Sequence, residues 1–241
     1  MESEIYLRHP GWCPLCERNV IFSSKSKWLR DFFLCSSCGS IPRERALFTV
    51  IREQFPNYRH LCLHESSPAS RGASLKLKME CANYSASQYY PCIPHGSIDP
   101  TTGFRCENLE KLTFPDNSFD ILVTQDVMEH IFDYEKAFRE IARVLKPGGA
   151  HIFSVPIVNK SNQSERWASR TEAGEVVYHR EPEYHGNPVD DKGSLVTMHW
   201  GYDIARHVMD SANTPTTIVT IDDIDRGIRA EYIDILISRK R

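Results

Sequence analysis

Two Cys-x2-Cys pairs constrain the first forty residues more than any other feature of this 241-residue chain. The pairs are Cys13/Cys16 and Cys35/Cys38, with 18 residues between them. Two such hooks can each hold one side of a tetrahedral Zn²⁺ through thiolates at about 2.3 Å. The alternatives are two disulfides or four unrelated buried thiols. Because four cysteine ligands close the coordination shell, the spacing predicts a zinc ion that folds the module and does no chemistry.

Composition indicates a chain that stays in a reducing compartment. The start, Met1 to Glu4, is acidic where a secretion signal needs a basic and then an apolar region. No stretch approaches the roughly 20 apolar residues of a membrane span. We therefore expect a cytoplasmic protein with no membrane partner, which favours zinc over disulfides. With 41% hydrophobic residues the chain can bury a core, so a disordered chain is excluded.

Charge divides the chain into two unequal parts. Residues 1–60 hold nine Lys and Arg against six Asp and Glu, whereas the whole chain has a net charge of −3. This excess is too small to predict a phosphate-binding surface, so a nucleic-acid partner is not expected.

The residues between and after the cysteine pairs predict a small zinc ribbon followed by a helix. Residues 20–22 and 32–34 are expected to form two short strands facing each other. Ser40 is the expected N-cap of a helix over 42–55, with Pro42 in its first turn and apolar residues at helical spacing. We predict a zinc ribbon over 1–40 and a second domain over 41–241.

From residue 60 onward the pattern alternates between strand and helix. Strands are predicted at 61–64, 103–106, 119–124 and 150–155, and a helix capped by Asp133 precedes the last of them. A further strand, the second in order, is expected to end around residues 81 to 85. Such alternation predicts an α/β fold with a parallel sheet that is covered on both faces. Ligands bind at the carboxyl ends of the strands in such sheets.

Three segments carry a family resemblance. They are FPDNSFDI at 114–121, VMEHI at 127–131 and RVLKPGG at 143–149, in the order and separations of class I S-adenosylmethionine-dependent methyltransferases. The resemblance implies a Rossmann-like, seven-stranded, mostly parallel sheet, closed by an antiparallel hairpin at 216–221 and 230–238. The ribbon together with CGSIPR at 38–43 also resembles bacterial methyltransferases found near sugar and polysaccharide genes.

The resemblance also implies which residues bind S-adenosylmethionine. Glu65 takes the acidic position after the first strand, although it could instead cap a helix, and Ser67 stands where the family has glycine. Tyr84, Ser85 or Gln88 would replace the ribose-binding acid, which is missing. The adenine side falls to Glu107, Asn108 and Leu109, and the sulfonium side to Gln125. The alternative for Glu107 is a solvated loop acid.

Residues 157–200 form a long insertion rich in aromatic and histidine residues, where we expect the acceptor pocket. A nucleophilic oxygen or nitrogen can need a general base, for which histidine is the default. His199 is the first candidate base, with Trp200 as an aromatic wall, and His130 is the second. A plain surface loop anchored by a tryptophan, and a structural role for His130, are the alternatives.

The sequence therefore predicts a methyltransferase with structural Zn²⁺ that acts on an oxygen or nitrogen of a small molecule. The favoured acceptor class is a sugar or a sugar-derived natural product. One alternative is an RNA base methyltransferase that uses the ribbon for recognition. Another is a catalytically inactive binding or scaffolding protein, because the glycines and the ribose acid are missing. The sequence predicts no oligomeric state.

Overall fold

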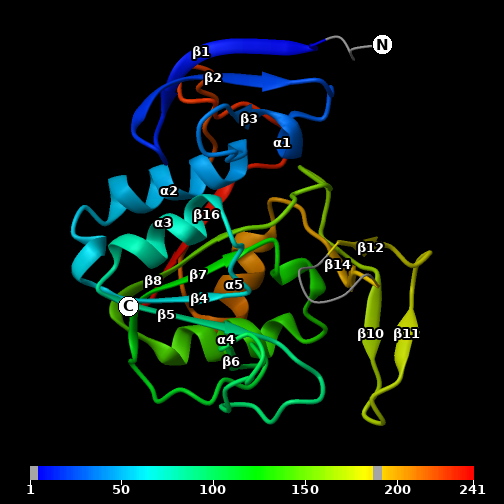
Figure 1. Cartoon of the computed structure of the whole chain (residues 1–241). Helices are drawn as coiled ribbons and strands as arrows, with labels where there is room; N and C mark the ends of the chain where they lie inside the picture. The colour runs from blue at the N-terminus through cyan, green and yellow to red at the C-terminus, as the bar shows by residue number, and fades with distance from the viewer. Residues whose placement is uncertain (1–4, 187–191) are drawn as a thin grey trace.

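The computed structural model describes residues 5–186 and 192–241, and its centre is one seven-stranded sheet (Figure 1). The strand order is β15-β16-β8-β7-β4-β5-β6. All pairs are parallel except those of β16, which runs antiparallel to both β8 and β15. The strands are β4 (Cys62–Ser66), β5 (Asn83–Gln88), β6 (Arg105–Cys106), β7 (Phe119–Gln125), β8 (Leu145–Ser154), β15 (Thr216–Val219) and β16 (Ile235–Arg239).

Helices cover both faces of this sheet. On one face, α2 (Pro42–Gln54) and α3 (Gly72–Glu80) pack with the alternate residues Ile121 and Val123 of β7. On the other face, α4 (Tyr134–Val144) and α5 (Ile204–Ala212) pack with Leu122, the residue between Ile121 and Val123 in the sequence. Side chains alternate across a strand, so a continuous apolar run supplies both cores. The α/β fold class and the antiparallel C-terminal hairpin predicted from the sequence are confirmed.

The N-terminal residues form a three-stranded antiparallel sheet of β1 (Leu7–Cys13), β2 (Arg18–Ser24) and β3 (Leu34–Cys35). The strand predicted at 32–34 is partly wrong, because the helix α1 (Leu29–Phe32) occupies its start. The cap of α2 is Ile41 and not Ser40: the backbone N–H of Ile41 donates to the Glu44 carboxylate at 3.0 Å.

The segment between β15 and β16 returns to this N-terminal sheet. The backbone N–H of Trp12 donates to the carbonyl of Asp225 at 2.8 Å, and the buried Arg45 donates to the carbonyl of Gly227 at 3.0 Å. A Cβ at Gly11 would lie 2.1 Å from the Asp225 carbonyl oxygen, so only glycine allows this approach. The N-terminal residues thus share one core with the sheet, and the boundary at residue 40 stays a prediction.

The described part of the insertion contains three small antiparallel strand pairs. Strands β10 and β11 form an arm that projects from the body (Figure 1). The strands are β9 (Glu165–Arg166), β10 (Ala168–Arg170), β11 (Val176–Tyr178), β12 (Tyr184–His185), β13 (Ser194–Leu195) and β14 (Met198–His199), with pairs β9/β14, β10/β11 and β12/β13. Short 3-10 helices stand at Tyr58–His60 (η1) and Met128–His130 (η2). Within the described residues, no helix is long and apolar enough to cross a bilayer.

Candidate functional site

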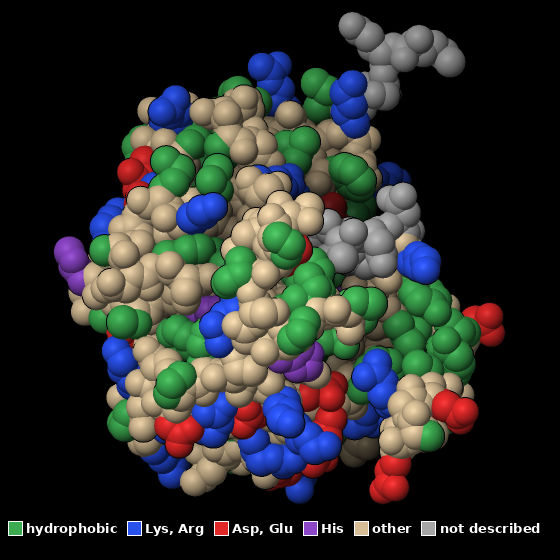
Figure 2. Space-filling model, turned by 60° about the horizontal axis from the view of Figure 1, so that its bottom comes forward, with side chains coloured by type: hydrophobic (Ala, Val, Ile, Leu, Met, Phe, Trp, Pro, Cys, Tyr) green, Lys and Arg blue, Asp and Glu red, His purple; other side chains and the backbone are tan. Residues whose placement is uncertain are grey.

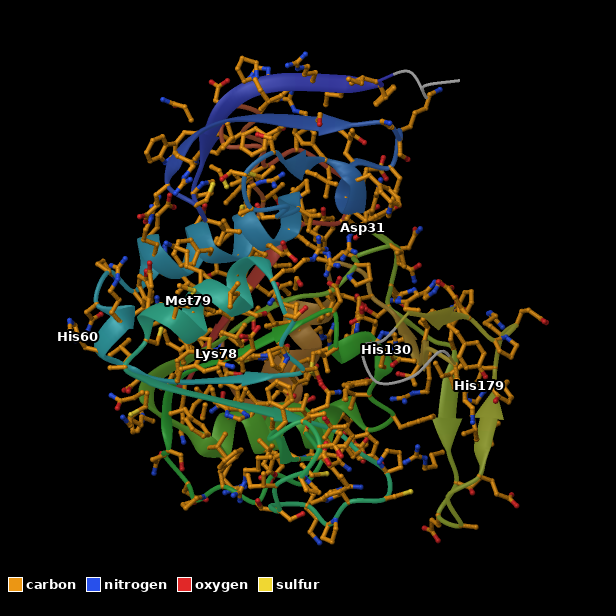
Figure 3. The ribbon with its side chains drawn as sticks, in the orientation of Figure 1. Asp31, His60, Lys78, Met79, His130 and His179 are labelled. Atoms are coloured by element: carbon orange, nitrogen blue, oxygen red, sulfur yellow. The ribbon has the colours of Figure 1, made fainter. Side chains whose placement is uncertain are left out.

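A cavity of about 1010 Å³ opens at the carboxyl ends of the parallel strands. Its walls come from the turns after β4, β5, β6, β7 and β8, from the insertion, and from the N-terminal module. The sheet topology places these turns together, as expected for a parallel α/β sheet. In Figure 3, Asp31 of the module and His130 of η2 lie on this side of the molecule, whereas His60 and Met79 lie on the other.

The turn after β4 has an unusual backbone. Ser67 has a φ of +57°, in the left-handed region that favours glycine, and the turn lines the cavity. Gly72, with a φ of +60°, begins α3 immediately after the turn, and a Cβ there would lie 2.2 Å from a Glu44 carboxylate oxygen. Glycine therefore lets α2 approach the turn, although the glycine positions expected within the turn hold other residues.

Glu65 is fully buried beneath this turn and does not belong to the cavity wall. Its carboxylate accepts hydrogen bonds from Ser74 Oγ at 2.7 Å, Tyr84 Oη at 2.9 Å and Gln125 Nε2 at 2.9 Å. Burial raises the pKa of Glu65, and these three donors oppose the rise. The arrangement makes Glu65 a support that fixes the turn from below.

The second predicted strand, expected to end around residues 81 to 85, ends later in the structure. Helix α3 continues to Glu80, so β5 runs over 83–88 and Tyr84 is its second residue. Tyr84 therefore lies away from the carboxyl end, and it is outside the cavity wall. Gln88, which ends β5, lines the cavity instead.

Glu107, Asn108 and Leu109 follow β6 and line the cavity. The buried Glu107 carboxylate accepts from Arg105 Nε at 2.6 Å and from the Thr113 backbone N–H and hydroxyl at 2.9 and 2.5 Å. A carboxylate offers about four acceptor positions, so one is left for a ligand. The alternative of a solvated loop acid is wrong, because Glu107 is 3% exposed.

A buried ion-pair cluster joins the N-terminal module to the end of β7. Asp126 accepts from Arg30 Nη2 at 2.7 Å and from Arg43 Nη1 at 2.8 Å, and Ser154 Oγ donates to it at 3.0 Å. Burial would raise the pKa of Asp126, but Arg30 and Arg43 more than offset this and lower it to about 2. Because Arg30, Arg43 and Asp126 all line the cavity, the module helps to build the site.

Two residues after the cluster, η2 brings Glu129 and His130 to the cavity wall. Burial raises the pKa of Glu129 well above its usual value and Asp126 adds to this. Burial lowers the pKa of His130 to about 4. His130 Nδ1 contacts the Leu195 carbonyl at 2.9 Å; a carbonyl only accepts, so Nδ1 carries the proton and Nε2 keeps the lone pair.

His199 reaches the same cavity from β14. Its Nε2 contacts Glu183 Oε2 at 3.0 Å, and its ring stacks on Trp167 at 3.7 Å between centroids. The other oxygen of Glu183 contacts His185 Nε2 at 3.1 Å. Burial would raise the pKa of Glu183, but the two histidines lower it. The carboxylate therefore fixes both rings, with the His199 lone pair on Nδ1.

The structure thus brings both predicted bases, Ser67, Gln125 and the 107–109 segment to one cavity. Trp200, expected as an aromatic wall, is instead fully buried in the core with α4 and α5. His199, which precedes Trp200, lines the cavity. Because successive residues of extended chain point to opposite sides, Trp200 points into the core. The residues that sequence reasoning missed are Arg30, Arg43, Glu129 and Glu183, and only their nearness in the fold identifies them.

The four cysteines of the two hooks converge. Their sulfur atoms all lie within 4.8 Å of one another, and Cys13–Cys38 and Cys16–Cys35 are each 3.8 Å apart. A disulfide needs about 2.05 Å, so the disulfide alternative does not fit. Four thiolates at about 2.3 Å from one tetrahedral ion lie roughly 3.8 Å apart. The donor set therefore has the dimensions of a zinc site.

The sheet order, the crossover helices and the cavity at the strand ends define a Rossmann-like methyltransferase fold. Residues 81–153, less than a third of the chain, match the family model described as "Methyltransferase domain". The chain is also 38% identical over 76 residues to the ubiquinone/menaquinone biosynthesis C-methyltransferase UbiE of Cronobacter sakazakii. That match covers 29% of this chain and 30% of the relative.

Two solved structures share the fold. An S-adenosylmethionine-dependent methyltransferase from Mesorhizobium loti has a TM-score of 0.51 at 15% identity, over 81% of this chain and 98% of that one. An S-adenosylmethionine-bound amino pentose methyltransferase from Micromonospora echinaspora has a TM-score of 0.52 at 11% identity, over 84% and 93%. At such identities the similarity shows the fold alone.

Proposed function

We propose that this chain transfers a methyl group from S-adenosylmethionine to an oxygen or nitrogen of a small molecule. The cavity carries the proposal: the turn after β4, the end of β5 and the 107–109 segment meet at it, in the part of the sheet where such folds bind ligands. When bound, the cofactor supplies an electrophilic methyl group, so the protein needs mainly to align the acceptor and exclude water.

The cofactor-binding assignments follow from which side chains line the cavity. We assign the left-handed turn at Ser67 to close backbone contact, Gln88 to the ribose hydroxyls, and Glu107, Asn108 and Leu109 to the adenine side. Gln125, predicted at the sulfonium side, donates its amide to Glu65 and also lines the cavity. Glu65 and Tyr84, both predicted as direct ligands, are reassigned as supports of the turn.

His199 is our proposed general base, because Glu183 holds its ring and leaves Nδ1 free to take a proton. His130 is the second candidate, and burial makes it the weaker base by lowering its pKa to about 4. Around these rings the wall carries the carboxylates of Glu129 and Glu183 together with Arg170. Such polar walls suit an acceptor with several hydroxyl groups.

A sugar or sugar-derived natural product is our favoured acceptor class. The resemblance at 38–43 supports this, as do the charged side chains near His130 and His199 in the wall, and an amino pentose methyltransferase has the same fold. An RNA acceptor has less support: on the face shown in Figure 2, Lys and Arg side chains lie scattered among Asp and Glu. Stable nucleic-acid binding needs basic residues gathered along the backbone path.

Calorimetry with S-adenosylmethionine and S-adenosylhomocysteine is the test of cofactor binding. We expect micromolar dissociation constants for both, and about tenfold weaker binding by Gln88→Ala through loss of hydrogen bonds to the ribose. Gln54→Ala is the matched control, since Gln54 is exposed at the end of α2 and outside the cavity wall. A folded protein that binds neither compound at millimolar concentration would instead support the scaffolding alternative.

We also propose that the four cysteines bind structural Zn²⁺, on the strength of their sulfur–sulfur distances. The ion would hold the loop before β2 against the residues after β3, beneath which α2 begins. Cys35→Ser is expected to lower the zinc content to well below one per chain and to lower the melting temperature by several degrees. Cys92→Ser, at an exposed cysteine outside the cluster, is the control, and equal zinc in both variants would refute the site.

A further inference from the structure

Glu129, in the short helix η2, carries a buried carboxyl group. It is 1% exposed, and neither carboxylate oxygen has a hydrogen-bond partner within the described part of the chain. Its neighbours Arg30 and Arg43 are both bound to Asp126. Burying a carboxyl group without hydrogen bonds is unfavourable, so buried carboxyl groups normally have a hydrogen-bond donor, a cation or a metal ion as partner. Because Glu129 also lines the cavity, this partner would come from the cavity side.

Two histidines stand beside this carboxylate. One ligand atom each from Glu129, His130 and His185 lies within 4.8 Å of the other two. The rings of His130 and His185 meet edge to face, with centroids 5.2 Å apart. Ligand atoms bound to one tetrahedral metal ion at about 2.1 Å lie roughly 3.4 Å apart, so the three groups would close by up to about 1.4 Å on binding.

Hydrogen bonds on the far side of each ring orient both histidines. His130 Nδ1 donates to the Leu195 carbonyl, which leaves the Nε2 lone pair on the side of Glu129, 3.9 Å from its Oε1. His185 Nε2 contacts the Glu183 carboxylate at 3.1 Å, which leaves its lone pair on Nδ1. Metal-binding histidines are almost always held in this way, by a carbonyl or carboxylate on the other nitrogen.

We propose that Glu129, His130 and His185 form a second metal site, of the type with two histidines and one carboxylate, for a divalent transition metal. Imidazole with one carboxylate suits Zn²⁺, Fe²⁺ or Co²⁺, whereas Mg²⁺ and Ca²⁺ require shells of oxygen. Three protein ligands leave coordination positions open, unlike the closed shell of four cysteines.

The open positions would face the cavity, because all three ligands belong to its wall. A metal there would accept oxygen donors, so the site predicts an acceptor with two neighbouring oxygens, such as a vicinal diol. The metal would orient this acceptor and favour its deprotonated form. Metal binding itself needs no cofactor, and its test is therefore separate from that of the proposed methyl transfer.

Titration with Co²⁺ tests this site on the full-length protein loaded with a single equivalent of zinc per chain, which the four thiolates bind in preference to the histidine and carboxylate ligands. Calorimetry should show one further equivalent of Co²⁺ per chain. The visible absorption of the bound Co²⁺ should be weak and without thiolate charge-transfer bands. Such bands would instead show that Co²⁺ has exchanged into the cysteine site. Glu129→Gln and His185→Ala should each weaken this binding at least about 100-fold, and Glu183→Gln about 10- to 100-fold.

His179→Ala is the matched control, since His179 lies on the β10–β11 arm, bonded to Ser169 and outside the cavity wall (Figure 3). The His179→Ala variant should still bind the further equivalent of Co²⁺. His185 is only half-buried, so its variant should fold even where Glu129→Gln does not. The proposal is wrong where the wild type binds no further Co²⁺, or where the second equivalent survives in His185→Ala.

Discussion

Replacing His199 by alanine is expected to lower turnover about 10²- to 10³-fold and to leave the affinity for S-adenosylmethionine within about twofold of wild type. The imidazole is held by Glu183 and stacked on Trp167 at the cavity wall, and it belongs to the insertion and not to the turns assigned to the cofactor. Removing it takes away the proton acceptor and not the cofactor contacts. Release of S-adenosylhomocysteine with an acceptor found by screening hydroxylated compounds measures turnover, and calorimetry measures cofactor affinity.

Glu183→Gln separates positioning from catalysis. The glutamine can still accept from one ring but no longer carries the charge that holds both, so we expect a loss of about tenfold in kcat with little change in KM. His60→Ala, at an exposed residue of η1 on the opposite side of the molecule, should match wild type (Figure 3). Wild-type turnover in His199→Ala would remove its assignment as the base.

Replacing Arg30 by methionine is expected to lower the free energy of unfolding by about 3 kcal/mol, at the lower end of the range for breaking a buried ion pair. The Arg30 side chain is 9% exposed and that of Asp126 15% exposed, so solvent would replace the lost partner poorly. Arg43 would still bind Asp126, which limits the loss. Urea unfolding at neutral pH measures the effect.

The pH dependence tests the cause of this loss. The pKa of Asp126, about 2 when folded, lies below its ordinary value, so its ionised form stabilises the protein above pH 4. That contribution disappears as the pH falls from about 4 to 2. The pKa of Asp126 rises in Arg30→Met, and the stability gap to wild type should therefore narrow over this range.

Two variants serve as controls for Arg30→Met. Arg59→Met removes an exposed pair with Glu80 and should cost less than about 1 kcal/mol. The double variant Arg30→Met, Asp126→Asn should cost less than the sum of the two single variants, because both single variants remove the same ion pair. Equal destabilisation by Arg30→Met and Arg59→Met would show that the buried cluster contributes nothing special.

The elements of the sheet could be predicted because their signals are local. Apolar runs gave β4, β7 and β8, and Asp133 caps α4 as expected, accepting from the Lys136 backbone N–H. Helix α2 was predicted within one residue of its end. Strand β5 was misplaced because Asn83–Gln88 is polar and its limits are set by pairing with β4 and β6.

The candidate site could be predicted only in part, because its chemistry depends on residues far apart in sequence. Motif positions pointed to Ser67 and the 107–109 segment, and the histidine-rich insertion pointed to His199. No sequence motif relates Arg30 to Asp126, which follows it by 96 residues, or Glu129 to His185. Such pairs become neighbours only when the N-terminal module and the insertion close over the strand ends.

The return of residues 223–233 to the N-terminal sheet has a consequence for biosynthesis. Trp12, Arg45 and Arg30 donate hydrogen bonds to the backbone carbonyls of Asp225, Gly227 and Tyr232, respectively. The donors and acceptors of these hydrogen bonds are therefore synthesised about 200 residues apart. Strand β16, which joins the C-terminal hairpin to the parallel strands, is synthesised after both. The first strands of a nascent chain therefore cannot complete these contacts, nor the cavity that Arg30 and Tyr232 line, until residue 232 has left the ribosome.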